Sequence, residues 1–179
     1  FTEVGSITAL PYAGNAKPRL WRLPKSQAIV VHIGLANRGA EVIAAQLEQN
    51  TFPIPVGISM AHIHGIPDYT ATADRFRDIG DYDTLNVSCP NVAGGGDGQL
   101  PAVLDALLTA YRQLHLTKPV FVKISPDLAF TQVDQLVDIM IQYQVTGIIC
   151  GNLTKDRNNP AMVDPTVPAI GGISGKPTR

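Results

Sequence analysis

Short apolar runs alternate along this chain with longer segments in which apolar residues recur every three or four positions. Several of the short runs are continuously apolar, which is typical of strands buried on both faces of a parallel sheet. The longer segments are typical of amphipathic helices that cover such a sheet. The pattern predicts strands at residues 2–8, 55–60, 84–89, 120–125 and 147–152, and helices at residues 39–49, 68–79, 100–116 and 131–143.

The segments between these elements are rich in proline, glycine and polar residues. Residues 10–24 predict an irregular arm or a small hairpin, and residues 27–33 predict a short apolar segment. Near the end of the chain, residues 153–170 predict a long polar connection and residues 171–176 a tight glycine turn. The alternation of strand and helix predicts a single α/β domain over residues 1–179 with a parallel sheet. Such a sheet can close into a barrel or stay open as a doubly wound sheet. The doubly wound sheet is the alternative, although no G-x-G-x-x-G run follows any strand.

Residues 84–91, TLNVSCPN, form the stretch with the clearest chemical content. Apolar and polar side chains alternate here with the period of a strand, and Pro90 ends the strand because proline cannot donate to a sheet. Asn86 and Asn91 therefore flank the thiol of Cys89 at a strand end. The two amides could hold a flat polar ligand while the thiol moves a proton. The alternative is that Cys89 is a small buried hydrophobe and that Asn91 begins a turn.

Lys123 is a further candidate, since it lies inside an apolar strand. A lysine in such a place is costly to bury unless an anionic partner meets it, and the charge of a cofactor would be such a partner. Otherwise the side chain reaches the sheet edge or pairs with a carboxylate such as Asp127.

Cys150 belongs to no motif and is expected in the core. His62 and His64 have no third ligand in evidence, so no metal site is expected.

Composition narrows the class of protein. With 45% hydrophobic and 16% charged residues, the chain is typical of a soluble globular domain, and its net charge of −1 gives no reason to expect nucleic acid as a partner. No apolar run approaches the ~20 residues of a membrane span, and no signal peptide is visible. Two cysteines make no disulfide framework, which favours a cytoplasmic setting. Because the chain begins at Phe1 without a methionine, we expect it to be part of a longer protein.

Four motifs occur in sequence: NVSCPN at residues 86–91, KISPD at 123–127, NLTKDR at 152–157 and GGISGKP at 171–177. In this order they resemble the motifs of the FMN-dependent dihydroorotate dehydrogenases. The resemblance implies a (β/α)8 TIM barrel, whose active sites lie at the carboxyl ends of the strands. Such barrels typically need ~250 residues, so we expect an incomplete barrel with about five of the eight β/α units.

The resemblance also implies a reaction: oxidation of dihydroorotate to orotate in de novo pyrimidine (UMP) biosynthesis, with hydride transfer to FMN. Cys89 stands at the position of the family's base. Asn86, Asn91 and Asn152 stand at positions that bind the substrate. The positions that the resemblance assigns to FMN are Gly5, Ser6, Ser59, Asn86, Lys123, Gly151 and Gly175.

Partners of the reaction are only partly implied. A cysteine base is usual in the soluble class of the family, whereas the arm at residues 14–19 and the region of Asn152 resemble the membrane-associated class. The electron acceptor therefore stays open between a quinone, fumarate or another compound. Peripheral membrane association is expected if the acceptor is a quinone, and a homodimer is one assembly that the sequence allows.

Two positions depart from the family. Val31 stands where the family usually has an asparagine that binds the substrate, and Leu153 stands where it tends to have serine or threonine. His32 or Asn37 could compensate for the lost contact. These departures favour an alternative function, a related FMN oxidoreductase acting on another dihydropyrimidine or an enone.

The resemblance does not extend to the family's first strand or to its last two. Because the last two strands carry the loops that hold the FMN phosphate, this chain alone is expected to bind FMN poorly. A truncated, non-catalytic barrel that only folds or binds a partner is the second alternative.

Overall fold

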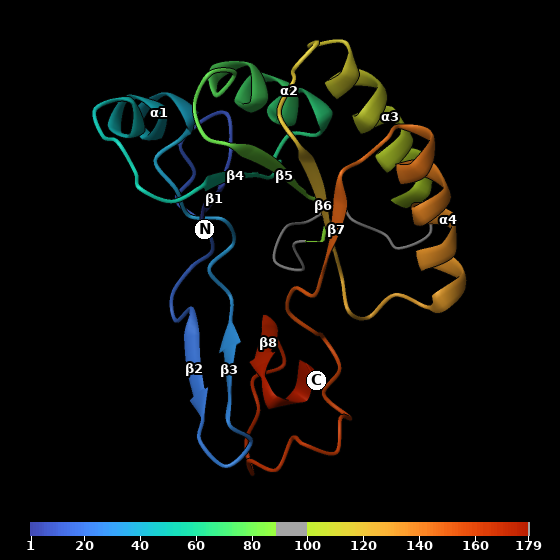
Figure 1. The fold of residues 1–179 in the computed structure, drawn as a ribbon. Helices are drawn as coiled ribbons and strands as arrows, with labels where there is room; N and C mark the ends of the chain where they lie inside the picture. Colours follow the sequence, from blue (N-terminus) through green and yellow to red (C-terminus); the bar gives the residue numbers. More distant parts are fainter. Residues whose placement is uncertain (89–99, 179) are drawn as a thin grey trace.

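The computed structural model describes residues 1–88 and 100–178, and its main feature is a parallel sheet covered by helices on one face. Five strands follow one another in the order β1-β4-β5-β6-β7. They are β1 (Thr2–Ile7), β4 (Val56–Met60), β5 (Tyr82–Asn86), β6 (Val120–Ile124) and β7 (Gly147–Cys150). The helices are α1 (Ala40–Glu48), α2 (Ile66–Arg75), α3 (Leu100–Arg112) and α4 (Phe130–Gln142). The helices form an arc outside the curved sheet, as successive β/α units of a barrel do (Figure 1).

A second, antiparallel sheet lies beyond the carboxyl ends of these strands (Figure 1). It consists of β2 (Leu20–Leu23), β3 (Ala28–Val31) and β8 (Gly172–Gly175), and a short 3-10 helix, Lys176–Thr178, follows it. β3 is the central strand, and Val30 lies opposite Ile173 of β8. Leu23, Val30 and Ile173 are buried together in a small core. The sheet therefore joins segments from the two ends of the chain.

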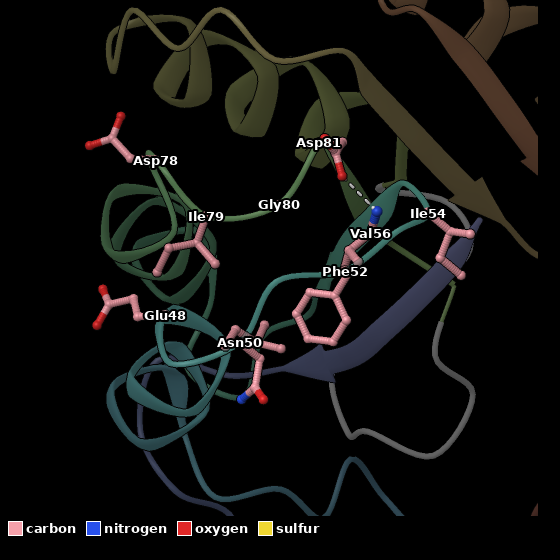
Figure 2. A pocket seen from close by; sticks show the side chains of 10 residues that line it. Glu48, Asn50, Phe52, Ile54, Val56, Asp78, Ile79, Gly80 and Asp81 are labelled. Carbon is pink, nitrogen blue, oxygen red and sulfur yellow. Dashed lines mark hydrogen bonds between the residues drawn. The ribbon is translucent and has the colours of Figure 1, made fainter.

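A cavity of about 440 Å³ lies at the opposite edge of the main sheet, near the amino ends of β4 and β5. Figure 2 shows that the end of α1, the loop before β4 and the turn before β5 surround it. Phe52 and Ile54 in its wall are about half exposed. The Asp81 carboxylate accepts a hydrogen bond from the Val56 amide at 2.7 Å and so joins the loop to the turn. Active sites of parallel barrels lie at the other edge of the sheet, so this cavity is not the expected place for catalysis.

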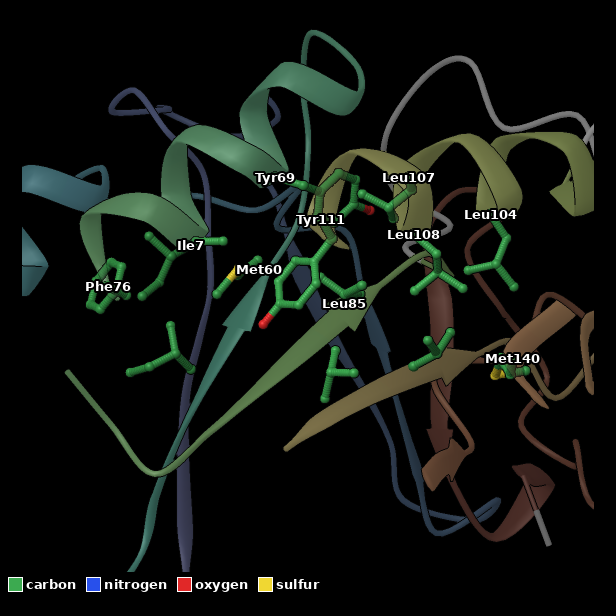
Figure 3. Packing of buried hydrophobic residues seen from close by; sticks show 14 of the residues in the cluster. Ile7, Met60, Tyr69, Phe76, Leu85, Leu104, Leu107, Leu108, Tyr111 and Met140 are labelled. Carbon is green, nitrogen blue, oxygen red and sulfur yellow. The ribbon is translucent and has the colours of Figure 1, made fainter. Parts of the chain in front are cut away.

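The hydrophobic core fills the space between the main sheet and the helices (Figure 3). Alternate strand residues such as Ile58, Met60 and Leu85 point into it and are fully buried. Helices α2 and α3, with the residue that follows α2, contribute Tyr69, Phe76, Leu104, Leu107, Leu108 and Tyr111. Because side chains alternate along a strand, the opposite face of the same strands carries Ser59, Thr84, Asn86 and Lys123. The packing of the apolar face therefore directs the polar residues to the inside of the curve.

A buried ion pair fastens β5 to its neighbours. The Lys118 ammonium is 2.7 Å from the Asp83 carboxylate, and the Tyr111 hydroxyl donates to the same carboxylate at 2.6 Å. Lys118 also donates to the backbone carbonyls of Phe76 and Ile79. Burial raises the pKa of Asp83, against the opposing effects of Lys118 and Tyr111.

The predicted strands and helices of the main sheet are confirmed to within a few residues at each end. Two expectations are wrong. Residues 171–176 are not only a turn, since Gly172–Gly175 form β8 and pair with β3. Cys150 is exposed and not in the core, because it ends β7, the last strand of the sheet order, and in the described part of the chain no α-helix follows β7.

Candidate active site

Polar side chains from three neighbouring strands meet at the carboxyl edge of the main sheet. Asn86, the last residue of β5, donates from its side-chain amide to Ser6 Oγ on β1 at 2.8 Å. Ser6 Oγ lies 2.9 Å from Ser59 Oγ on β4. Ser59 and Asn86 are both buried. The three side chains thus form a continuous hydrogen-bond network across the ends of β1, β4 and β5.

The loops after β5 and β7 extend this hydrogen-bond network. Asn86 Oδ1 accepts hydrogen bonds from Ser88 Oγ at 3.1 Å and from the Asn152 side-chain amide at 3.3 Å. The same Asn152 amide donates to Ser88 Oγ at 2.9 Å. We call Ser6, Ser59, Asn86, Ser88 and Asn152 the amide–hydroxyl cluster. It is rich in donors and acceptors that suit the edge of a flat polar ring.

Behind the cluster, α2 fixes the end of β5. The hydroxyl of Tyr69 donates to the Asn86 backbone carbonyl at 2.7 Å, and both residues are buried. The ring of His62 lies 5.4 Å from the ring of Tyr69. Burial lowers the pKa of His62, and the charge of Asp68 opposes this effect. Within residues 1–88 and 100–178, no three His, Cys, Asp or Glu side chains gather in a way that could hold a metal ion.

Lys123 lies beside the cluster on β6, directly opposite Asn86 in the strand register. Its side chain is half-buried, and it forms no hydrogen bond or ion pair with the described residues. The alternative pairing with Asp127 is wrong, because that carboxylate accepts instead from the Thr154 hydroxyl and the Lys155 amide. The ammonium group is therefore left as a positive charge on the inner face of the sheet.

Two glycines bring open backbone to the same edge. Gly5 precedes Ser6 at φ 140°, and a Cβ atom there would be 2.4 Å from the Ser59 carbonyl oxygen. Gly151 precedes Asn152 at φ 122°, and a Cβ atom there would meet nothing within 4 Å. Gly5 is thus required by close packing of β1 on β4. Gly151 faces open space, which a planar ligand could approach closely.

Other predicted site residues lie elsewhere. Gly175 lies in the second sheet, opposite Ala28 of β3. Val31 ends β3 and pairs with Gly172, so it also belongs to the second sheet. Cys89 and Asn91 lie outside the described residues.

Neither residue expected to replace the lost contact is placed in the cluster. The Asn37 amide donates to Thr8 Oγ1 and to the Leu35 carbonyl, and its oxygen accepts from the Gly39 amide. These bonds fix the start of α1. His32 interacts with the side chain of Asn15, at 3.3 Å from Nδ1 to the amide nitrogen.

Sequence reasoning missed Ser88 and Tyr69. Ser88 follows Asn86 at strand spacing inside the NVSCPN motif, and that position was the available signal. Tyr69 carried no such signal, because its hydrogen bond joins a helix to a strand end.

Comparison with known proteins decides the family. The sequence profile of "Dihydroorotate dehydrogenase" matches residues 1–179. This chain belongs to the dihydroorotate dehydrogenase family.

Members of the family named "Dihydroorotate dehydrogenase (quinone)" include relatives from Synechococcus sp. (strain JA-2-3B'a(2-13)) and Haloarcula marismortui. Each is 36% identical to this chain. The alignments cover 100% and 99% of the chain, but only 53% and 52% of the relatives. The chain therefore spans about half the length of the curated relatives that it matches.

Solved structures of the family agree with the fold. The ferulenol complex of the enzyme from Eimeria tenella superposes with a TM-score of 0.85 at 25% identity, over 98% of this chain and 55% of that one. The ligand-free form gives the same TM-score over 99% and 58%. The predicted fold, an incomplete TIM barrel, is thereby confirmed. Among the described helices, none is both long and apolar enough to span a bilayer.

Proposed function

We propose that the complete protein oxidises dihydroorotate to orotate with FMN as its cofactor, as a step of de novo pyrimidine biosynthesis. The observation that carries the proposal is the amide–hydroxyl cluster beside Lys123 at the carboxyl edge of the sheet, in a chain of this family. Membership in the family alone would support the fold and the general reaction. The cluster adds amide and hydroxyl side chains, which suit a polar ring, at the carboxyl edge of the sheet, where the active sites of barrels lie.

FMN fits the residues present. Lys123 has a charge with no partner among the described residues, which suits the negative charge that a reduced flavin ring carries. Gly5, Ser6 and Ser59 offer backbone and hydroxyl groups on the neighbouring strands, and Gly151 leaves open space beside Asn152. Bound FMN would supply a two-electron acceptor for the hydride from C6 of dihydroorotate. Gly175, on the second sheet, is left out of this proposed site.

The substrate would be held by carboxamides. Asn86 and Asn152 each present a donor and an acceptor, which match the alternating amide groups of a pyrimidine ring. Asn91 is the third proposed amide contact, from its position in the motif. In the described structure the two amides satisfy each other and Ser88, so a bound ring would exchange these bonds for its own.

Cys89 is the proposed base. It directly follows Ser88, whose hydroxyl belongs to the cluster, and its thiolate would accept the proton from C5 as the hydride leaves C6. A thiol near its ordinary pKa is mostly protonated at neutral pH, so the base would form in the substrate complex or transiently. Asn86 and Asn152 would orient the substrate toward this base.

A quinone is the proposed electron acceptor. Eight relatives at 34–37% identity carry the name "Dihydroorotate dehydrogenase (quinone)". With such an acceptor, the complete protein would work at a membrane surface, where quinones are dissolved. Comparing a water-soluble quinone with fumarate as oxidant of the reduced enzyme tests this choice.

A second candidate function is oxidation of another dihydropyrimidine or an enone by the same flavin chemistry. It is favoured by two apolar residues, Val31 and Leu153, at positions where the family usually presents polar contacts. Leaving a polar group of the ligand without a partner costs about 1–3 kcal/mol. A substrate without that polar group would not incur this cost.

Anaerobic mixing tests the proposal. The complete protein is expected to carry stoichiometric FMN and to lose its flavin absorbance when dihydroorotate is added. A panel of other dihydropyrimidines and enones, added in the same way, tests the second candidate. Flavin that stays oxidised with dihydroorotate but bleaches with a member of the panel would replace the first function by the second. A complete protein without flavin would contradict both.

The role of Cys89 has its own test. Cys89→Ser is expected to slow flavin reduction much more than it weakens orotate binding, because serine is a poorer base of similar size. Equal effects on rate and binding would remove Cys89 from the role of base.

A further inference from the structure

Thr154 follows Asn152, a residue of the amide–hydroxyl cluster, by two positions in the sequence. It is 4% exposed and lies four residues beyond the end of β7. Its backbone exchanges two hydrogen bonds with Ile173 of β8, at 3.0 Å and 2.8 Å. Ile173 is itself fully buried in the small core of the second sheet. Thr154 thus joins the loop that carries Asn152 to the second sheet.

The side chain of Thr154 makes a second connection. Its hydroxyl donates to one oxygen of the Asp127 carboxylate and accepts from the Asp156 amide at 3.0 Å. The other carboxylate oxygen accepts from the Lys155 amide at 2.6 Å. The Asp127 carboxylate therefore binds two consecutive residues of the loop after β7. Because Asp127 follows β6, these bonds connect the loops after β6 and β7. Hydrogen bonds to an ionised acceptor are among the stronger ones.

Between β7 and this junction only residues 151–153 remain. Gly151 has open space around it, and a glycine restricts the backbone little. The Leu153 amide donates to the Asn152 side-chain oxygen at 2.9 Å, which sets the direction of that amide group. The three-residue span is thus held by the β7 ladder at one end and by Thr154 at the other.

We propose that Thr154, held by Asp127, is a positioning residue that fixes the orientation of the Asn152 amide toward the ligand. The inference rests on the proposed function, because Asn152 is taken as a substrate contact. Without the Thr154 hydroxyl, the span 151–153 gains freedom, the bond between Leu153 and Asn152 Oδ1 opens more often, and the amide leaves the direction that matches the ring. Misplacement of a positioning group by about 1 Å can cost about 100-fold in rate.

A matched pair of variants isolates the hydroxyl. Thr154→Val keeps the shape and the two backbone bonds to Ile173 but removes the hydroxyl, whereas Thr154→Ser keeps the hydroxyl. In the complete protein, Thr154→Val is expected to raise the Kd of orotate roughly 10- to 100-fold, read from a titration of the flavin absorbance, with unchanged flavin content. Thr154→Ser is expected to bind like the wild type. Asp127→Asn should resemble Thr154→Val, and Asp134→Asn, an exposed carboxylate on α4 without a partner among the described residues, is the control.

Amide hydrogen exchange provides a readout without ligand. The amides of Leu153 and Lys155 donate to Asn152 Oδ1 and to Asp127, so both are expected to exchange at least about tenfold faster in Thr154→Val and in Asp127→Asn. Ile173 should keep its protection. Unchanged exchange at Leu153 together with wild-type orotate binding would overturn the inference.

The exchange measurement also separates two failures. If the wild-type complete protein does not respond to orotate, the proposed substrate is wrong, but faster exchange at Leu153 still supports the positioning role. If the wild type responds and Thr154→Val responds equally, the positioning role is wrong and the proposed function stands. Should Thr154→Val not fold, Asp127→Asn alters the same contact from the exposed side and decides between the same outcomes.

Discussion

The side-chain amide of Asn152 donates to Ser88 Oγ at 2.9 Å, although the two residues follow different strands of the main sheet. Ser88 follows β5 and Asn152 follows β7, and β6 lies between these strands in the sheet. The two loops therefore meet across the end of the strand that carries Lys123. This arrangement brings the Asn86 and Asn152 amides together beside Lys123, and these are three residues on which the proposed site depends.

Removing the Asn152 amide tests this contact. Asn152→Leu keeps a similar volume but loses the bonds to Ser88 and Asn86 and those proposed to the substrate. With each net hydrogen bond contributing about 0.5–1.5 kcal/mol, two lost bonds should weaken orotate binding by roughly 5- to 150-fold. Titration of the flavin absorbance with orotate measures it. Asn50→Ala, at an exposed residue just beyond the end of α1, is the control, and wild-type affinity in Asn152→Leu would contradict the prediction.

The proposed contact between Lys123 and FMN predicts an effect of this charge on the reduction potential of the flavin. Lys123→Met removes a cation that no described residue neutralises, so the reduced, negatively charged ring loses stabilisation. A hydrogen bond to a charged group contributes about 1.5–3 kcal/mol, which for a two-electron couple corresponds to roughly 30–65 mV. The potential of Lys123→Met is therefore expected to be lower by about that amount, measured with reference dyes in the complete protein. Lys17→Met, in the exposed arm, is expected to leave the potential unchanged, and a Lys123→Met potential equal to the wild-type value would count against the contact.

The main sheet could be predicted because its signals are local. The mostly apolar runs at β4 and β6, the alternation from Leu85 onward at the end of β5 and the helical spacing around Leu104 and Leu136 are visible in a few consecutive residues. Since the active sites of barrels lie at the carboxyl ends of the strands, the family resemblance implied that Asn86, Lys123 and Asn152 belong to one site. The structure has Asn86 bonded to Asn152 and opposite Lys123.

The rest depends on contacts between distant segments. Gly172–Gly175 contain two glycines, which are depleted in strands, so β8 depends on the partner edge that β3 offers it. Asp127 belongs to a motif that sequence alone ties to Lys123, yet its carboxylate binds the loop after β7. Exposure of Cys150 likewise follows from what packs on β7 and not from the residues of β7.

The ion pair between Lys118 and Asp83 should dominate the stability of β5. Asp83 is fully buried and Lys118 nearly so, and removing one partner of such a pair leaves an uncompensated charge. Lys118→Met is expected to lower the free energy of unfolding by about 3–5 kcal/mol. The double variant Asp83→Leu/Lys118→Met should recover a large part of this loss, because no charge is then left buried.

Urea unfolding of the complete protein measures both variants. Asp74→Asn breaks the exposed pair with Arg77 and should change stability by less than about 1 kcal/mol. A loss in Lys118→Met no larger than that of Asp74→Asn would mean that the buried pair does not hold β5.

The contact between Ser26 and Asp164 should weaken in acid. Ser26 is fully buried, and its amide and hydroxyl both donate to the Asp164 carboxylate, at 2.7 Å and 2.6 Å. These bonds, the hydroxyl first, lower the pKa of Asp164. A carboxyl whose pKa is lower in the folded state stabilises that state above its unfolded pKa of about 3.9 and loses the effect as the pH falls through the folded pKa. The hairpin of the second sheet should therefore separate from the segment around Asp164 only below about pH 4.

Carbon NMR of the Asp164 carboxyl group measures its titration directly. The midpoint is expected below about 3.9 in the wild type and nearer to that value in Ser26→Ala. This variant keeps the hydrogen bond from the backbone amide of residue 26 to Asp164 but lacks the one from the hydroxyl. Protection of the Ser26 amide against hydrogen exchange, corrected for the intrinsic pH dependence, should fall over the same range in the wild type. In Asp164→Asn the protection should be lower and independent of pH, because the side chain no longer titrates. The same midpoint in the wild type and in Ser26→Ala would mean that another group lowers the pKa, and the hairpin would then not be released by protonation of this contact.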